Sequence, residues 1–349
     1  MPPRTLYALT VALLAVLLAF AACNDDKNGD GDAGDDGNGN RPSAEALRVL
    51  STVSPITSIA ENIGGTRIKL EGLVPEGVNS HTFEPPVSFV AKIADADLII
   101  LNGLQLEDPT LELAEANKQD DAVILLVGDN TITPDEYKFD FSFPESEGMP
   151  NPHLWPNPRL TANYAELIHE QLVELDPDNA GYYDTNYDEL TARLQALDDA
   201  MAEATATVPE ENRRLLTYHD SWAYWAELYG FTVVGAIQPS DFAEPSAGEV
   251  ADLIDQINEE QIPAIFGSEV FPSPVLVQIA DETGAEFIDD LRDDDLPGEP
   301  GDDRHSYIGL MVQNMRVMLP ALGGDASAMD SVDASLVFTD GDSPANYPQ

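Results

Sequence analysis

The stretch NAGYYDTNYDELTARLQALDDAMAEATAT, residues 179–207, decides the fold more than any other part of the sequence. It runs for about 28 residues without a proline, and a helix of this length, rising roughly 1.5 Å per residue, spans about 40 Å. Its one glycine, Gly181, lies near the start. Such a helix can cross a small protein and connect two lobes. A loop in this position would permit a wide hinge, whereas one long helix would resist it.

Short apolar runs alternate with helical patterns on both sides of this stretch. Runs that are rich in β-branched residues and bounded by Gly, Pro or Asn are typical of buried strands. Alternation of strands and helices predicts parallel sheets covered by helices on both faces, so two such sets predict two α/β lobes. The expected strands are 47–53, 68–74, 97–102 and 122–127, then 215–218, 231–237, 264–266 and 287–291, and the expected helices are 55–63, 86–94, 160–175, 246–260 and 274–283.

The chain begins with a segment typical of an export signal. Arg4 supplies a positive charge, an apolar run follows, and two alanines precede Cys23. The run of about 17 apolar residues is short for a membrane span, which needs about 20. The residues before Cys23 resemble the lipobox of bacterial lipoproteins, although Phe20 stands where leucine is usual. We expect Cys23 to carry a lipid anchor; the alternative is an uncleaved signal anchor. Because Cys23 is the only cysteine, the chain has no internal disulfide.

The two segments that flank the expected folded part show no pattern of helices or strands. Residues 24–40, NDDKNGDGDAGDDGNGN, predict a flexible tether, and the residues from about 324 onward predict a loose tail. The expected organisation is a signal peptide (1–22), a lipidated cysteine with an acidic tether (23–43), an N-terminal α/β lobe (44–178), a connecting helix (179–207), a C-terminal α/β lobe (208–323) and a loose acidic tail (324–349).

Acidic residues dominate the charge of the chain. Its 349 residues include 64 Asp and Glu against 16 Lys and Arg, a formal net charge of −48. Such a surface repels phosphate backbones and anionic lipids, which argues against nucleic-acid binding and against electrostatic binding to a membrane. The tether contains six Asp and the tail five, so most of the acidity belongs to the folded part. This balance suits cations, positively charged partners or a saline exterior.

Three of the five histidines lie in loops that follow predicted strands or open the connecting region. His81 and His219 follow predicted strands, where open α/β sheets bind their ligands, and His153 lies in a loop flanked by prolines. His169 lies in a predicted helix and His305 in an acidic loop. The three loop histidines are 72 and 66 residues apart and form no local zinc motif, so their spacing does not show that they converge. Taken alone, these residues favour an exported, two-lobed binding protein with a cleft.

Several stretches follow one another in a characteristic order: LVPEGVNSHTFEPPVSFVAKIADADLIILNGLQLE, NPHLWPNP, DPDNAGYYDTNYDEL, TYHDSWAYWAELYGF, EPSAGEVADLIDQI and EFIDDLRDDDLPGEPGDDRHSYIGLM. They resemble the metal-receptor lipoproteins of bacterial zinc and manganese ABC uptake systems, over about residues 48–322. The resemblance implies two four-stranded parallel α/β lobes, joined by one long rigid helix, with a metal-binding cleft between the lobes. This agrees with the organisation inferred from the pattern.

The resemblance also implies the ligands of one metal ion between the lobes. The implied histidine ligands are His81, His153 and His219. The fourth ligand is a carboxylate after the last strand of the second lobe, where relatives have a motif like LYSDALG. The segment LRDDDLPG aligns best on Asp294, and a shift of one residue would select Asp293 or Asp295. We expect Glu84 and Glu269 to support the site without binding the metal directly.

Three imidazoles and one carboxylate suit Zn²⁺, and the absence of sulfur ligands argues against Cu(I). By resemblance, manganese-leaning members tend to have a carboxylate at the position of His219. The His-rich loop of many zinc members is missing, because residues 108–121 contain no histidine.

The expected function is capture of Zn²⁺ (or Mn²⁺) as a bound substrate and its delivery to an ABC permease. The receptor is expected to be a monomer without enzymatic activity, anchored to the outer face of the bacterial cytoplasmic membrane through Cys23. The alternatives are a Mn²⁺-specific receptor of the same family, a surface adhesin with a structural metal, and a zinc hydrolase.

Overall fold

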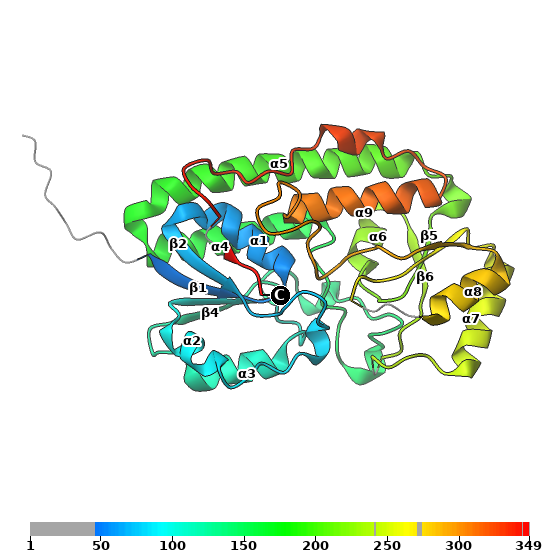
Figure 1. Ribbon diagram of the computed structural model, residues 1–349, viewed down its shortest axis with the longest axis horizontal. Coiled ribbons are helices and arrows are strands. Elements are labelled where there is room, and N and C mark those ends of the chain that lie inside the picture. Colours follow the sequence, from blue (N-terminus) through cyan, green and yellow to red (C-terminus); the bar gives the residue numbers. More distant parts are fainter. Residues whose placement is uncertain (1–45, 241, 271–273, 344, 349) are drawn as a thin grey trace, which may run out of the picture. The chain divides into compact units, whose positions relative to one another are not determined.

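The computed structural model of the protein (Figure 1) describes residues 46–240, 242–270, 274–343 and 345–348. The predicted signal peptide, Cys23 and the acidic tether lie outside these residues. The strands are β1 (Leu47–Ser51), β2 (Ile68–Gly72), β3 (Leu98–Leu101), β4 (Val123–Leu126), β5 (Arg214–Thr217), β6 (Thr232–Ala236), β7 (Ala264–Phe266), β8 (Glu286–Ile288) and β9 (Ala345–Asn346). The helices are α1 (Ser54–Gly64), α2 (Phe89–Asp95), α3 (Asp108–Asn117), α4 (Pro158–Leu175), α5 (Ala180–Ala206), α6 (Ala223–Tyr229), α7 (Ala247–Glu260), α8 (Pro274–Thr283) and α9 (Tyr307–Ala321).

The first lobe contains a parallel sheet with the strand order β4-β3-β1-β2-β9. Successive side chains of a strand point to opposite faces, and β3 shows the consequence. Leu98 and Ile100 pack into a large core with α1, whereas Ile99 and Leu101 pack into a second core with α2 and α3. In Figure 1, α1 lies on one side of these strands, and α2 and α3 lie on the other. A strand that is buried on both faces must be apolar throughout, as β3 is.

The second lobe contains a parallel sheet with the order β6-β5-β7-β8. Leu215 packs into the large core, and its neighbour Leu216 packs into a separate core with α7 and α8. Both sheets are therefore covered on both faces by helices. The prediction of two parallel α/β lobes is confirmed.

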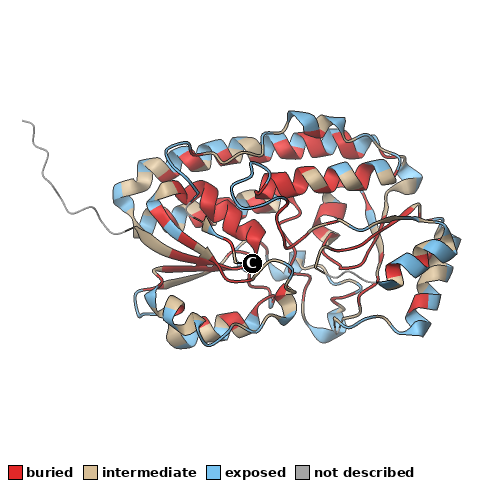
Figure 2. Cartoon of the chain, viewed as in Figure 1, coloured by how far each residue is buried: buried red, intermediate tan, exposed pale blue. Residues whose placement is uncertain are grey.

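The helix α5 connects the two lobes, as residues 179–207 predicted. It is 27 residues long, and Leu190, Leu194 and Leu197 recur on its buried face at helical spacing. These residues belong to the same hydrophobic core as Val49 of the first sheet and Phe266 of the second. In Figure 1, α5 runs along both lobes and α9 lies beside part of it, and Figure 2 shows that α1 and α9 are buried over most of their length. One core thus spans both lobes.

Three helices, α3, α6 and α9, were not predicted from the sequence pattern. In α9, buried residues occupy nearly every position from Tyr307 to Met315. A helix that is apolar on all sides shows no contrast between two faces, so its pattern lacks a helical period. In the structure, α9 packs against both α1 and α5, which explains why it is apolar on all sides.

The prediction of a loose tail after residue 323 is wrong for the described residues there. Strand β9 pairs in parallel with β2, so the first sheet has five strands instead of four. Met329, Phe338 and Tyr347 are buried, and the hydroxyl of Tyr347 donates a hydrogen bond of 2.6 Å to Glu61 of α1. These three anchors are isolated in the sequence and follow no period, so the pattern gave no sign of their packing.

None of the helices in the described part of the chain combines the length and the apolarity that crossing a bilayer requires.

Replacement of Tyr347 by Ala should lower the free energy of unfolding by about 3 kcal/mol or more, because it removes a buried aromatic ring and leaves Glu61 without one of its donors. Chemical denaturation measures this loss. Asn346→Ala, at the exposed position next to Tyr347, is the control and should change stability by less than about 0.5 kcal/mol. Equal, small effects of the two substitutions would restore the loose-tail interpretation.

Candidate metal centre

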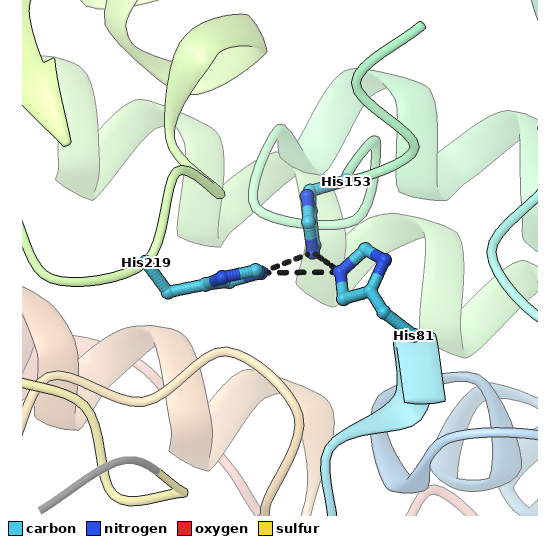
Figure 3. Close-up of side chains that lie close together, drawn as sticks. All are labelled: His81, His153 and His219. Carbon is cyan, nitrogen blue, oxygen red and sulfur yellow. Dashed lines mark hydrogen bonds between the residues drawn. The ribbon is translucent and has the colours of Figure 1, made fainter. Parts of the chain in front are cut away.

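Three loops bring three imidazoles together (Figure 3). His81 lies in a 3₁₀ turn, Ser80–Thr82, after β2; His153 lies in the loop before α4; and His219 lies just beyond β5. The Nε2 atom of His81 is 3.2 Å from the Nε2 atoms of His153 and His219, and these last two are 3.0 Å apart. No other group of three His, Cys, Asp or Glu side chains in the described residues has this geometry.

The separation of the three nitrogens suits one metal ion. An ion that binds tetrahedrally at about 2.0–2.1 Å from each nitrogen needs nitrogens about 3.3 Å apart. The observed separations of 3.0–3.2 Å differ from this by a few tenths of an ångström. Each imidazole would therefore move little on binding.

The two amide-containing residues before His81 and His153 shape their loops in the same way. The side-chain oxygen of Asn79 accepts a hydrogen bond of 2.9 Å from the backbone N–H of His81, and that of Asn151 accepts one of 3.0 Å from His153. An Asn side chain that binds the backbone two residues later stabilises a tight turn. The repeated Asn-x-His pattern is a sequence signal for the local shape of both loops.

The histidines are held in a buried environment. His153 and His219 are buried and His81 is partly exposed. Burial lowers the pKa of His81 and of His153 well below the usual value of 6.5, and the electrostatic interaction with the neighbouring His219 adds to this effect. Neutral imidazoles are the form that binds metal ions, so these two side chains are ready to act as ligands at neutral pH.

A turn of three buried aspartates, Asp293 to Asp295, lies beside the triad. The carboxylate of Glu269 accepts hydrogen bonds from the backbone N–H groups of all three, at 2.9, 3.2 and 3.1 Å. Trp155 donates a hydrogen bond of 2.8 Å from its indole N–H to the carbonyl oxygen of Asp293. The turn is therefore fixed from two sides, by Glu269, which the sequence singled out, and by the buried side chain of Trp155.

The three aspartates have different surroundings. Asp295 accepts a hydrogen bond of 2.7 Å from the backbone N–H of Gly77. Asp293 has a buried oxygen, Oδ2, without a hydrogen-bond partner and 3.8 Å from the Nε2 atom of His219. Asp294 also has a buried oxygen, Oδ1, without a hydrogen-bond partner. Two carboxylates next to the triad thus have an oxygen available for a cation.

The electrostatics of this turn favour a bound cation. Burial raises the pKa of Asp294 well above its usual range, with a further contribution from Asp293, while contacts with Ser80 oppose the rise. Burial and then the three aspartates raise the pKa of Glu269. A divalent ion at the triad would offset the repulsion among these acidic groups.

The remaining candidates lie elsewhere. Glu84 is exposed. His169 pairs with Asp184 at 2.8 Å, and His305 packs against Tyr347 of the tail. The sequence reasoning did not identify Gln238, which contacts His219, or the aromatic rings near the triad. The position of Gln238 just beyond a predicted strand was a signal that could have pointed to it.

A family model described as zinc-uptake complex component A, periplasmic (ZnuA), matches residues 49–321. The manganese-binding lipoprotein MntA of Halalkalibacterium halodurans is 27% identical over 310 residues, which cover 89% of this chain and 96% of MntA. The iron-binding protein YfeA of Yersinia pestis is 32% identical over 286 residues, which cover 81% of this chain and 89% of YfeA.

Solved structures give the same result for the fold. The periplasmic zinc-binding protein TroA from Treponema pallidum superposes with a TM-score of 0.72 at 26% identity, over 79% of this chain and 99% of TroA. The names of these similar proteins differ in the metal that they state: manganese, iron or zinc.

Proposed function

The chain belongs to the family of zinc-uptake complex component A, periplasmic, and from this premise we propose that its substrate is Zn²⁺. Members of this family are solute-binding receptors and not enzymes, so the protein is a metal-binding, substrate-binding component of an ABC transporter. We infer that it captures the ion outside the cytoplasm and delivers it to the permease. The zinc hydrolase considered from the sequence does not agree with family membership.

The convergence of three Nε2 atoms is the observation that carries the choice of zinc. Imidazole nitrogens are preferred by zinc, whereas manganese prefers carboxylate, carbonyl and water oxygens. A site with three imidazole nitrogens and one carboxylate therefore favours the binding of zinc over manganese. The spacing of the nitrogens does not contribute to this choice, because an octahedral ion with longer bonds and angles near 90° needs a similar separation.

Asp294 is the proposed fourth ligand. The motif LRDDDLPG aligns on it, its Oδ1 atom is buried without a hydrogen-bond partner, and it contacts Ser80, the residue before His81. Asp293 is the second candidate, because its Oδ2 atom lies 3.8 Å from the Nε2 atom of His219. Either carboxylate would complete a four-coordinate site that leaves no open position for catalysis.

Single replacement of His81, His153 or His219 by Ala, or of Asp294 by Asn, should reduce zinc affinity at least about tenfold, because each change removes one of four ligands. Competition with a chromophoric chelator measures the affinity of the mature chain, and elemental analysis measures the bound zinc. His169→Ala removes a histidine that pairs with Asp184 outside the triad, and it should bind zinc as the unmodified chain does.

Asp293→Asn is the matched control for Asp294→Asn, because both replace a buried carboxylate of the same turn by an amide of equal size. A larger loss of affinity in Asp293→Asn would assign the fourth ligand to Asp293. Full zinc binding by all three histidine variants would refute the proposed site.

Manganese is the alternative substrate, because several similar proteins are named for manganese. Zinc binds more tightly than manganese at most protein sites, so a competition experiment between the two ions does not show which one is the substrate. We expect the Co²⁺-loaded chain to show the strong visible absorption of a four-coordinate site, which disappears on addition of one equivalent of Zn²⁺. The weak absorption of a six-coordinate ion would instead support a manganese receptor.

The chain is proposed to act as a monomer held at the outer face of the cytoplasmic membrane by a lipid on Cys23. Similar proteins are named lipoproteins, which supports this location. In a bacterial host, Cys23→Ser should move the protein from the membrane fraction to the soluble extracytoplasmic fraction. Ser43→Ala, which leaves the cysteine in place, is the control. Retention of the Cys23→Ser chain in the membrane would favour an uncleaved signal anchor.

A further inference from the structure

An aromatic ring covers one of the three imidazoles. Phe242, in the loop after β6, stacks on His81 with ring centroids 4.6 Å apart and an angle of 18° between the planes. The ring centroid of Phe143 lies 6.1 Å from that of Phe242 and 5.5 Å from that of His81. The backbone of Phe242 has φ = 57°, a region that bulky side chains rarely adopt. A residue in this conformation needs contacts that hold it there.

Gln238 supplies one of these contacts and also binds a histidine of the triad. Its side chain is buried. The Nε2 atom donates a hydrogen bond of 3.3 Å to the carbonyl oxygen of Phe242, and the Oε1 atom lies 2.7 Å from the Nδ1 atom of His219. One amide therefore lies between the ring that covers the site and an imidazole of the site.

These contacts determine the tautomer of His219. A backbone carbonyl only accepts hydrogen bonds, so the amide nitrogen of Gln238 must face Phe242 and its oxygen must face His219. The Nδ1 atom of His219 must then carry the proton, which leaves the lone pair of Nε2 directed at His81 and His153. The metal-binding form of His219 is set by the amide.

The amide of Asn151 orients His153 in the same way, but its nitrogen donates to a different residue than Phe242. Its Nδ2 atom donates a hydrogen bond of 2.7 Å to the carbonyl oxygen of Asp220, and its Oδ1 atom lies 2.8 Å from the Nδ1 atom of His153. Both amides therefore select the tautomer of a histidine. Of the two, only Gln238 also donates a hydrogen bond to Phe242, the residue whose ring covers His81.

We propose that Gln238 is a positioning residue that couples His219 to Phe242, so that a bound ion escapes only when the ring cover and the ligand loosen together. This inference rests on the proposed function, since it assumes that the triad holds the metal ion. Loss of the amide donor would release Phe242 from its strained conformation and uncover His81. The ion would then dissociate faster, even with all of its ligands in place.

Gln238→Glu tests the coupling in the mature full-length chain, because a carboxylate still accepts a hydrogen bond from the Nδ1–H of His219 but cannot donate one to the carbonyl oxygen of Phe242 at neutral pH. Zinc dissociation, followed by stopped-flow transfer to a chromophoric chelator, should accelerate about tenfold. Phe242→Ala should give a similar acceleration. In the double variant the two effects should not multiply, because the cover is already absent.

Ser142→Ala is the matched control. Its hydroxyl donates a hydrogen bond of 2.7 Å to the backbone carbonyl of Gln238, so the substitution removes a contact to the same residue and leaves the amide side chain intact. Its effect on dissociation should multiply with that of Phe242→Ala. If Gln238→Glu accelerates dissociation by the same factor with and without the ring of Phe242, the coupling does not exist.

A measurement on the metal-free chain distinguishes failure of this inference from failure of the proposed function. In ¹⁵N NMR spectra of the metal-free chain, His219 should be in the Nδ1–H tautomer, should remain so in Gln238→Glu and Phe242→Ala, and should become a mixture in Gln238→Leu. A chain that has this pattern but binds neither Zn²⁺ nor Mn²⁺ would refute the proposed function alone. Unchanged tautomer populations in Gln238→Leu would refute the role of Gln238.

Discussion

The packing of α5 against both lobes is the constraint on which the rest of the structure depends. Residues of the two sheets, of α1, of α5 and of α9 form one continuous hydrophobic core. Rotation of one lobe against the other would expose apolar surface along this core, at about 25 cal/mol per Å². The relative position of the two sheets is therefore held, and with it the loops that carry the histidines. Capture and release are expected to involve these loops and not a wide hinge.

Within this frame, polar side chains give the triad its orientation. Asn79 and Asn151 shape two of the histidine loops, while Asn151 and Gln238 select the tautomers of His153 and His219. Neutral amides suit this task, because their oxygen accepts a hydrogen bond from an imidazole N–H without adding charge. The three Nε2 atoms are thereby presented to one point, where a metal ion can replace the close contacts between them.

The charge of the acidic residues beside the triad is a second feature of the site. The aspartate turn and Glu269 place four acidic side chains in a poorly solvated region, and burial together with repulsion from neighbouring carboxylates raises the pKa of Glu269 and of Asp294. A divalent ion beside this turn would offset that repulsion, so acidic groups that repel one another without a cation would favour its binding. The acidity of the wider surface is separate from this effect, because charges exposed to physiological salt are screened within about 8 Å.

The sequence by itself determined the class of the fold, the long helix and the order of the motifs, because these depend on local periods and on contiguous residues. Strand β3 and helix α5 were both predicted from such patterns. Only the tertiary structure decided features that join distant segments. The anchoring of the tail through Tyr347, the convergence of three histidines, the surroundings of Asp293 and Asp294, and the link from Gln238 to Phe242 are of this kind. Each depends on which faces and loops the shared core brings together, and that information lies in the packing of the whole chain.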